Sequence, residues 1–221
     1  MDAALNQLGL PDGIGTVTEM IPFGGRNLTL LRPSDGDALL DALLEEDDPS
    51  EDDLPFWAEL WPSGVALTAL LAGRELRGVR TLELGCGLGL VGIAAAAGGA
   101  EVLATDWSEQ ALAFTAANAA ANRVRVRTGR VAWADPGPMT EAAPWPLVLA
   151  ADVLYEPRNV PLLLGLLPRL VDAEGEILLA DPGRPPSEGF LQGLDDDGGW
   201  DREAIATEVP RVTIHRLRRT G

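Results

Sequence analysis

The chain has 221 residues, of which 46% are hydrophobic and 23% charged, a composition typical of a folded globular protein rather than a disordered one. It carries 34 acidic and 17 basic residues, all of the latter arginine, for a net charge of −17. The absence of lysine excludes a Schiff-base or Walker-A lysine, and the single cysteine, Cys86, excludes an internal disulfide and a thiolate zinc cluster, so no metal site is expected.

Neither a nucleic acid nor a membrane is expected as a partner. Affinity for a phosphate backbone depends mainly on lysine and arginine, and this chain is strongly acidic. No basic leader precedes the first elements, and the longest uncharged apolar run, residues 84–100, contains six glycines where a membrane span needs about 20 well-packed apolar residues. We therefore expect a cytoplasmic protein, a monomer by default, whose negative surface attracts a basic protein segment or a cationic small molecule.

Residues 1–54 are predicted to form an extension packed on the domain that follows, residues 55–221. Apolar-rich runs at 16–21 and 27–31 flank two adjacent glycines, which predicts a hairpin. A helix should follow, with Ser34 as its N-cap.

Two segments are unusually rich in charge. Seven of the nine residues at 45–53 are acidic, which we interpret as a solvated loop, with a negative lip near a substrate entrance as the alternative. Residues 124–127 alternate valine with arginine. A charged edge strand that discourages edge-to-edge pairing explains this alternation better than a nucleic-acid strip.

From residue 80 onward, predicted strands alternate with predicted helices, which indicates a parallel sheet with helices on both faces. At the end of the chain, two strand-like runs at 204–209 and 212–217 are joined by a connection too short for a crossover helix, so the last strand should be antiparallel. The prediction is an α/β fold with a doubly wound, mostly parallel, seven-stranded Rossmann-like sheet and an antiparallel C-terminal hairpin. The predicted parallel strands are 80–84, 101–105, 124–128, 147–151 and 175–180, and the predicted helices are 90–97, 108–121 and 158–170.

Residues 81–89 (TLELGCGLG) read as a strand that runs into a glycine-rich turn before a helix. The glycines allow a sharp turn and the close approach of a ligand, and the start of the helix attracts an anionic group. Asp106 ends the next strand, where an acid suits the two hydroxyls of a ribose. The pattern therefore predicts a ligand that contains a nucleoside.

The glycine spacing alone leaves two cofactors open. Gly87, Gly89 and Gly92 also satisfy the G-x-G-x-x-G pattern of dinucleotide-binding proteins. Glu83 lies two residues before Gly85. An acid at that position would oppose a diphosphate but would suit the amino group of an amino-acid moiety, which favours S-adenosylmethionine (SAM).

Four further segments make the resemblance specific. The chain resembles a class I, seven-strand SAM-dependent methyltransferase of the lysine-methyltransferase-like family, in which a tryptophan segment precedes the glycine motif. The corresponding segments here are residues 55–64 (PFWAELWPSG), 131–135 (VAWAD) and 149–155 (LAADVLY). Residues 181–184 (DPGR), directly after the fifth predicted strand, resemble the corresponding segment in the branch of the family that includes the methyltransferase of the electron-transfer flavoprotein beta subunit.

The resemblance implies a SAM-binding role for nine residues. Glu83 would lie near the amino group of the methionine part, Asp106 would hold the ribose, and Trp133 would lie at the adenine edge with Asp135 as a partner for the exocyclic amine. The full set, from the N-terminal segment onward, is Trp61, Glu83, Gly85, Cys86, Gly87, Asp106, Trp107, Trp133 and Ala151.

Asp152 and Tyr155 match the D-x-x-Y element that borders the acceptor site in lysine-modifying relatives, so they are the candidate catalytic residues. Tyr155 fits equally well as packing at the entry of a helix. The only histidine, His215, is expected on an exposed surface, because side chains alternate along a strand and His215 therefore lies on the face opposite to that of Ile214.

These observations predict a SAM-dependent N-methyltransferase that acts on a protein lysine side chain by direct in-line methyl transfer. A small-molecule amine N-methyltransferase is the main alternative, since the core motifs are shared. A non-catalytic cofactor-binding partner protein and an NAD-dependent oxidoreductase are weaker alternatives, the latter because it leaves Trp61 and Trp133 unexplained.

Overall fold

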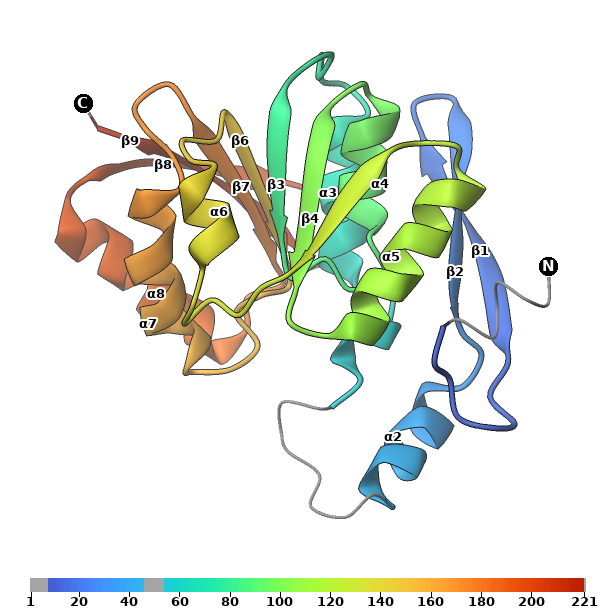
Figure 1. Ribbon diagram of the computed structural model, residues 1–221. Helices are drawn as coiled ribbons and strands as arrows, with labels where there is room; N and C mark the ends of the chain where they lie inside the picture. The colour runs from blue at the N-terminus through green and yellow to red at the C-terminus, as the bar shows by residue number, and fades with distance from the viewer. Residues whose placement is uncertain (1–7, 46–53, 221) are drawn as a thin grey trace.

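A seven-stranded sheet forms the centre of the protein, whose computed structural model describes residues 8–45 and 54–220 (Figure 1). The strand order is β5-β4-β3-β6-β7-β9-β8, and neighbours are parallel except β9, which is antiparallel to both β7 and β8. This arrangement confirms the predicted α/β fold with its antiparallel C-terminal hairpin. The strands are β3 (Arg80–Leu84), β4 (Glu101–Asp106), β5 (Val126–Arg130), β6 (Leu147–Ala151), β7 (Glu176–Asp181), β8 (Trp200–Ala206) and β9 (Thr213–Arg219).

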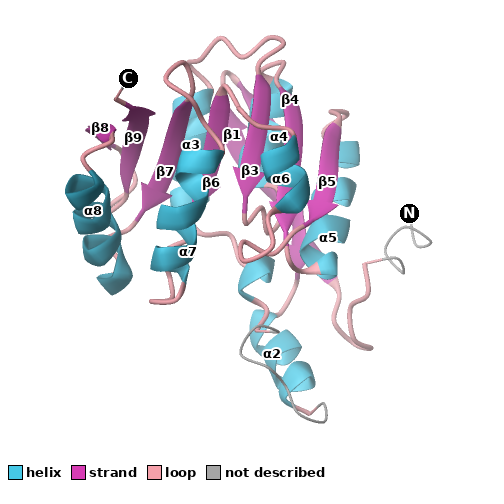
Figure 2. Ribbon diagram, turned by 60° about the vertical axis from the view of Figure 1, so that its left-hand side comes forward, coloured by secondary structure: helices cyan, strands magenta, loops and turns pink. Residues whose placement is uncertain are grey.

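Helices cover both faces of the sheet (Figure 2). Successive strand residues alternate between two apolar cores, so that Leu147 packs on the α3–α5 side and Val148 on the α6–α8 side. Because the central strands are buried on both faces, they read as nearly continuous apolar runs. One layer contains α3 (Pro62–Leu71), α4 (Leu90–Ala97) and α5 (Glu109–Ala121), and the other contains α6 (Gly137–Glu141), α7 (Asn159–Leu166) with the 3-10 turn η3 (Leu167–Arg169), and α8 (Pro185–Asp197).

The C-terminal strands differ in detail from the prediction. β8 begins at Trp200, earlier than the predicted 204–209, and β9 lies between β7 and β8. His215 pairs in register with Leu179 of β7, and the residue is only 8% exposed. The expectation of an exposed His215 is therefore wrong, and burial lowers the pKa of its imidazole.

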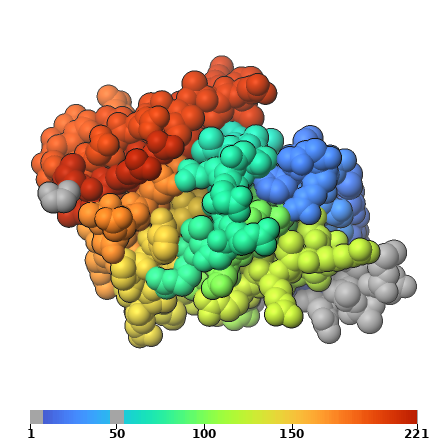
Figure 3. Space-filling view, turned by 90° about the horizontal axis from the view of Figure 1, so that it is seen from above, coloured from blue at the N-terminus to red at the C-terminus, as the bar shows by residue number. Residues whose placement is uncertain are grey.

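The predicted N-terminal hairpin is confirmed as β1 (Thr16–Phe23) paired with β2 (Arg26–Pro33), and it packs against α5. Asn122 accepts from the Thr29 amide at 2.8 Å and donates to the Thr29 carbonyl at 2.7 Å. Asn118 makes the same pair of bonds with Leu31, at 2.6 and 2.9 Å, and also donates to the Leu88 carbonyl at 2.9 Å. Two asparagine side chains thus satisfy the outer edge of β2 as a neighbouring strand would. Seen from above, this hairpin (blue) lies apart from the C-terminal strands (red) (Figure 3).

Other elements correct the sequence prediction at their ends. Asp35, rather than Ser34, caps α2 (Gly36–Leu44), since its Oδ1 accepts from the Ala38 amide at 2.9 Å. β5 begins at residue 126 instead of 124, and α3, α6 and α8 were not predicted. Of the acidic run at 45–53, all but the first residue lie outside the described residues. Within residues 8–45 and 54–220, every helix is too short or too polar to cross a bilayer.

Candidate active site

A cavity of about 1030 Å³ lies where the parallel strands β3, β4 and β6 end. The glycine-rich turn, the segment that leads into α3, and the loops after β4, β5, β6 and β7 line it. Ligands of open α/β sheets bind at this carboxyl edge. The cavity brings together the site residues predicted from the sequence with the exception of Asp135: Trp61, Glu83, Gly85, Cys86, Gly87, Asp106, Trp107, Trp133, Ala151, Asp152 and Tyr155.

The glycine turn is shaped by positive backbone dihedrals and tied to β4 by a carboxylate. Gly85 and Gly87 have φ values of 62° and 52°, and a Cβ on Gly87 would lie 3.2 Å from the Trp57 carbonyl oxygen. Asp106 accepts from the Gly87 amide at 2.9 Å and from the Ser108 amide at 3.0 Å. Burial raises the pKa of this carboxyl, and the same backbone amides oppose the rise. Asp106 therefore orders the turn, a role the sequence did not indicate.

Glu83 is a buried carboxyl beneath the turn. Its Oε2 has no hydrogen-bond partner in the described part of the chain, and a Cβ on Gly92 would collide with that oxygen. Burial raises the pKa of Glu83 to about 8, against the opposing effect of the Gly92 backbone amide. A buried carboxylate oxygen without a partner among the described residues can accept a hydrogen bond from an ammonium group brought by a ligand.

Cys86 is a backbone element of the turn with an unreactive thiol. Its Sγ lies 3.3 Å from Thr115 Oγ1, and burial raises the pKa of the thiol well above its usual value.

Aromatic side chains line the end of the cavity near β5. Trp133 and Trp107 both line it, and the Trp107 carbonyl accepts from Arg130 Nε at 2.9 Å. Asp135 is exposed and is not among the lining residues, although the sequence paired it with the adenine amine.

At the other end, two half-exposed aromatic rings border the cavity. Phe56, in the 3-10 turn η2 (Phe56–Ala58), and Tyr155, after β6, have ring centroids 5.4 Å apart. Trp61 Nε1 donates to the Phe56 carbonyl at 2.8 Å, which fixes this segment. Burial raises the pKa of the Tyr155 phenol, so it stays neutral at physiological pH.

Asp152 lines the same cavity in a left-handed backbone conformation, with φ 60°, and its amide donates to the Ala180 carbonyl at 2.9 Å. Its Oδ1 accepts from Arg184 Nε at 2.5 Å, while Oδ2 has no hydrogen-bond partner among the described residues. The Arg184 guanidinium also lies 5.1 Å from the centre of the Trp61 ring. Sequence reasoning missed Arg184 and Phe56 as site residues, although both lie in quoted motifs, because neither contact is local in the chain.

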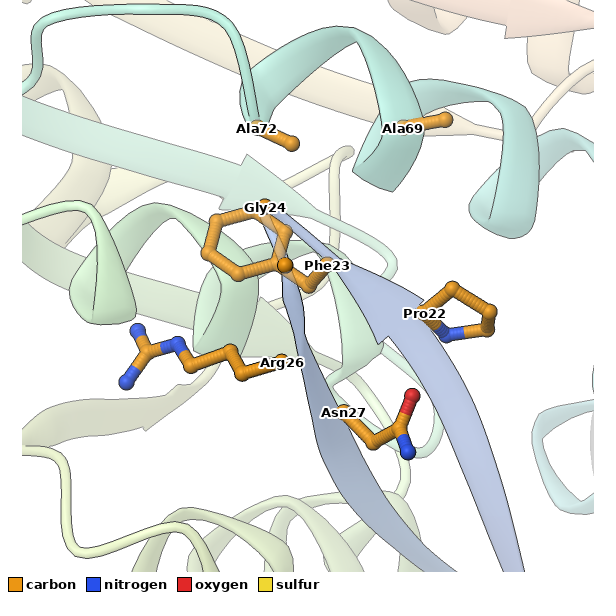
Figure 4. Close-up of a pocket in the computed structure, with 8 residues that line it drawn as sticks. Pro22, Phe23, Gly24, Arg26, Asn27, Ala69 and Ala72 are labelled. Carbon is orange, nitrogen blue, oxygen red and sulfur yellow. The ribbon is translucent and has the colours of Figure 1, made fainter.

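A second cavity, of about 440 Å³, lies between the hairpin tip and the end of α3 (Figure 4). Of the described residues that line it, Arg26 alone is charged, and its guanidinium already donates to the Ala97 carbonyl at 2.8 Å. The described residues that line this cavity include no acid and no nucleophile, so the chemistry belongs to the larger one.

The sequence matches the model of a family described as lysine methyltransferase over residues 53–196. The chain therefore belongs to the lysine methyltransferase family. This membership decides between the two cofactors that the glycine spacing allowed, because the family uses SAM.

Relatives of this family member include protein lysine methyltransferases. It is 36% identical over 134 residues to the electron transfer flavoprotein beta subunit lysine methyltransferase of Xenopus laevis, a match that covers 59% of this chain and 53% of that protein. It is 35% identical over 170 residues to mouse EEF1A lysine methyltransferase 3, covering 73% and 72%. The chain thus spans about half the length of the Xenopus relative.

The fold has solved counterparts. The magnesium protoporphyrin IX methyltransferase of Synechocystis, determined with bound SAM, matches with a TM-score of 0.58 at 18% identity and covers 85% of this chain and 92% of that one. This likeness shows the fold of a class I SAM-dependent methyltransferase.

The larger cavity fits SAM on three observations. Glycines with positive φ leave a groove that a Cβ would narrow, since a Cβ on Gly85 would lie 3.3 Å from Val153 and 3.5 Å from Trp133. Glu83 offers an unpartnered acceptor for an ammonium group, and Trp107 and Trp133 offer aromatic surface for a base.

Proposed function

We propose that this protein is a SAM-dependent N-methyltransferase that modifies a lysine side chain of another protein. The observation that carries the proposal is the acceptor end of the cavity. There Asp152 keeps one carboxylate oxygen without a partner among the described residues, and the Phe56–Tyr155 pair stands at the mouth. A cavity lined by both a carboxylate and aromatic faces suits an aliphatic amine.

The residues around the glycine turn would hold the cofactor. Glu83 would receive its ammonium group, Asp106 its ribose hydroxyls, and Trp107 and Trp133 its adenine. When bound, SAM supplies an electrophilic methyl group: the lone pair of the acceptor nitrogen forms the new N–C bond while the C–S electron pair stays on sulfur and S-adenosylhomocysteine leaves.

The protein contributes alignment and the exclusion of water. A lysine ammonium has a pKa of about 10.4 and must lose a proton to water before it can attack. Enclosure in the cavity disfavours the charged form and so promotes that loss. Asp152 orients the amine, and the Tyr155 and Phe56 rings enclose its methylene chain.

The relatives are described as protein lysine methyltransferases, which supports protein lysine as the substrate class of this chain. The net charge of −17 favours a basic segment as the docking partner. A small cationic amine meets the same charge requirement, so the test must separate the two.

The first experiment is calorimetric titration of the purified protein with S-adenosylhomocysteine, with NADH as control. Micromolar binding of the first alone is expected, and a folded sample that binds neither would overturn the proposal. Labelled-methyl transfer is then measured with protein and metabolite fractions kept separate, and mass spectrometry locates the modified residue. Label in a lysine supports the proposal, whereas label confined to the metabolite fraction reassigns the enzyme to small amines.

A further inference from the structure

Arg184 makes two contacts across the acceptor end of the cavity that the proposed mechanism does not yet use. Its Nε donates to Asp152 Oδ1 at 2.5 Å, and its guanidinium lies 5.1 Å from the centre of the Trp61 ring. The three residues come from segments more than 30 positions apart in the chain: the loop after β7, the loop after β6, and the residue before α3.

The backbone of Arg184 is itself held in place. Asp181 at the end of β7 accepts from the Gly183 amide at 2.7 Å, from the Arg184 amide at 3.1 Å, and from the Ser187 hydroxyl. Arg184 is also the N-cap residue of α8. The Arg184 side chain therefore extends from a loop whose backbone is fixed by hydrogen bonds.

The charges explain why such a contact matters for amine chemistry. The Asp152 side chain is 3% exposed, so water screens its charge poorly. An uncompensated carboxylate beside the acceptor would hold the amine as ammonium, because an opposite charge favours the charged form. Arg184 offsets that charge while leaving Oδ2 free of partners among the described residues.

We infer that Arg184 is a positioning residue for methyl transfer: it fixes Asp152 through one oxygen, leaves the other for the acceptor nitrogen, and balances the carboxylate charge so that the amine reaches its neutral form. This inference rests on the proposed function. Other ionisable side chains from β3, β4 and the neighbouring loops also face the cavity and act on the same amine: Glu59, Glu83, Asp106, Tyr155, Glu156 and Arg158.

The test is a pH–rate comparison of three variants. In Arg184→Ala, kcat falls about 10- to 100-fold, and the acidic limb of the kcat–pH profile, where the rate rises as the bound amine loses its proton, moves up by about one pH unit, because Asp152 then stabilises the ammonium. Arg184→Lys keeps the charge but not the planar donor, so kcat falls while the limb stays. In the double variant Asp152→Asn/Arg184→Ala the limb returns to its original position. A limb that does not move in Arg184→Ala overturns the inference.

Arg219→Ala is the matched control. Arg219 likewise lies over a tryptophan, 5.0 Å from the Trp200 ring, and pairs with Asp197 at 3.4 Å, but it lies on β9 away from the cavity. Its removal should change neither kcat nor the profile.

Hydrogen exchange of the ligand-free protein gives a readout that needs no activity. Arg184→Ala should speed exchange in peptides covering 55–61 and 150–155 at least tenfold, and Arg219→Ala in neither. If the wild type neither binds S-adenosylhomocysteine nor transfers methyl groups, the proposed function fails, while this exchange measurement still tests the Arg184 contacts. If the wild type methylates lysine and Arg184→Ala matches it in rate, profile and exchange, the inference alone fails.

Discussion

The two ends of the large cavity are built in different ways. At the glycine turn, the backbone does most of the shaping: Gly85, Gly87 and Gly89 all have positive φ, and the Asp106 carboxylate accepts from the amides of Gly87 and Ser108. At the acceptor end, side chains from three distant segments meet, in the contacts of Arg184 with Asp152 and Trp61. With the proposed function, the first construction would recognise a constant ligand, whereas single substitutions in the second would change the acceptor.

The sharpest separation of the two ends is expected from Asp152→Asn. Loss of the carboxylate misplaces the acceptor nitrogen, and a displacement of this kind costs on the order of 100-fold in turnover. Affinity for S-adenosylhomocysteine should stay within about threefold, because the glycine turn is untouched. Steady-state kinetics and calorimetry on one preparation measure both. A larger loss of affinity than of turnover would place Asp152 with the cofactor instead.

Asp106→Ala should show the converse pattern. Asp106 is a buried carboxylate that accepts hydrogen bonds from two backbone amides. Its removal should weaken S-adenosylhomocysteine binding about 10- to 100-fold, equivalent to about 1.5–3 kcal/mol. Calorimetry measures the loss, and Asp106→Asn, which keeps an oxygen acceptor, should lose less. Unchanged affinity in both variants would move the ribose away from Asp106.

The raised pKa of Glu83, about 8, predicts a pH-dependent affinity. Free protein holds the proton below that value, whereas an ammonium ligand favours the ionised form, so binding releases a proton. Affinity should therefore rise by at most about tenfold per pH unit up to about pH 8 and level off above it. Glu83→Gln should bind more weakly at high pH and show no such rise. Calorimetry in buffers of different ionisation enthalpy counts the released proton, and a flat wild-type profile would contradict the assignment.

The smallest effect is expected at the aromatic pair. Phe56→Ala removes one ring of the Phe56–Tyr155 contact, worth about 0.5–1.5 kcal/mol, so KM for the acceptor should rise about 2- to 10-fold. Binding of S-adenosylhomocysteine should not change. Phe23→Ala in the hairpin, remote from this cavity, serves as the control. A Phe56→Ala effect on cofactor affinity alone would show that the ring belongs to the other end.

The sequence predicted the parts of the fold that have a local signal. The β-α alternation from residue 80 and the glycine turn read correctly, since each is a run of adjacent residues. α3 was not predicted because it is apolar nearly all round and so lacks an amphipathic period, and α8 was not predicted because it begins with two prolines and contains two glycines. His215 was misplaced because its burial depends on the order of strands in the sheet, which alternation alone does not specify.

In the candidate site, too, the features with a local sequence signal were predicted and those that depend on distant residues were not. Every residue chosen from a motif except Asp135 lines the cavity, but the Arg184 contacts and the role of Asp106 in ordering the turn emerged only from the packing. Such interactions join positions that the sequence separates by 19 residues or more.

Asn118 links two parts of the molecule that a domain boundary would treat as separate. One side-chain amide holds the Leu31 carbonyl of the hairpin and the Leu88 carbonyl of the glycine turn, both at 2.9 Å. A truncated protein that starts at residue 55 would therefore lose the Leu31 partner of Asn118, the residue that also holds the glycine turn. A minimal catalytic fragment, or a fusion to another protein, should therefore retain the hairpin, because a cut at residue 55 breaks this hydrogen-bonded link.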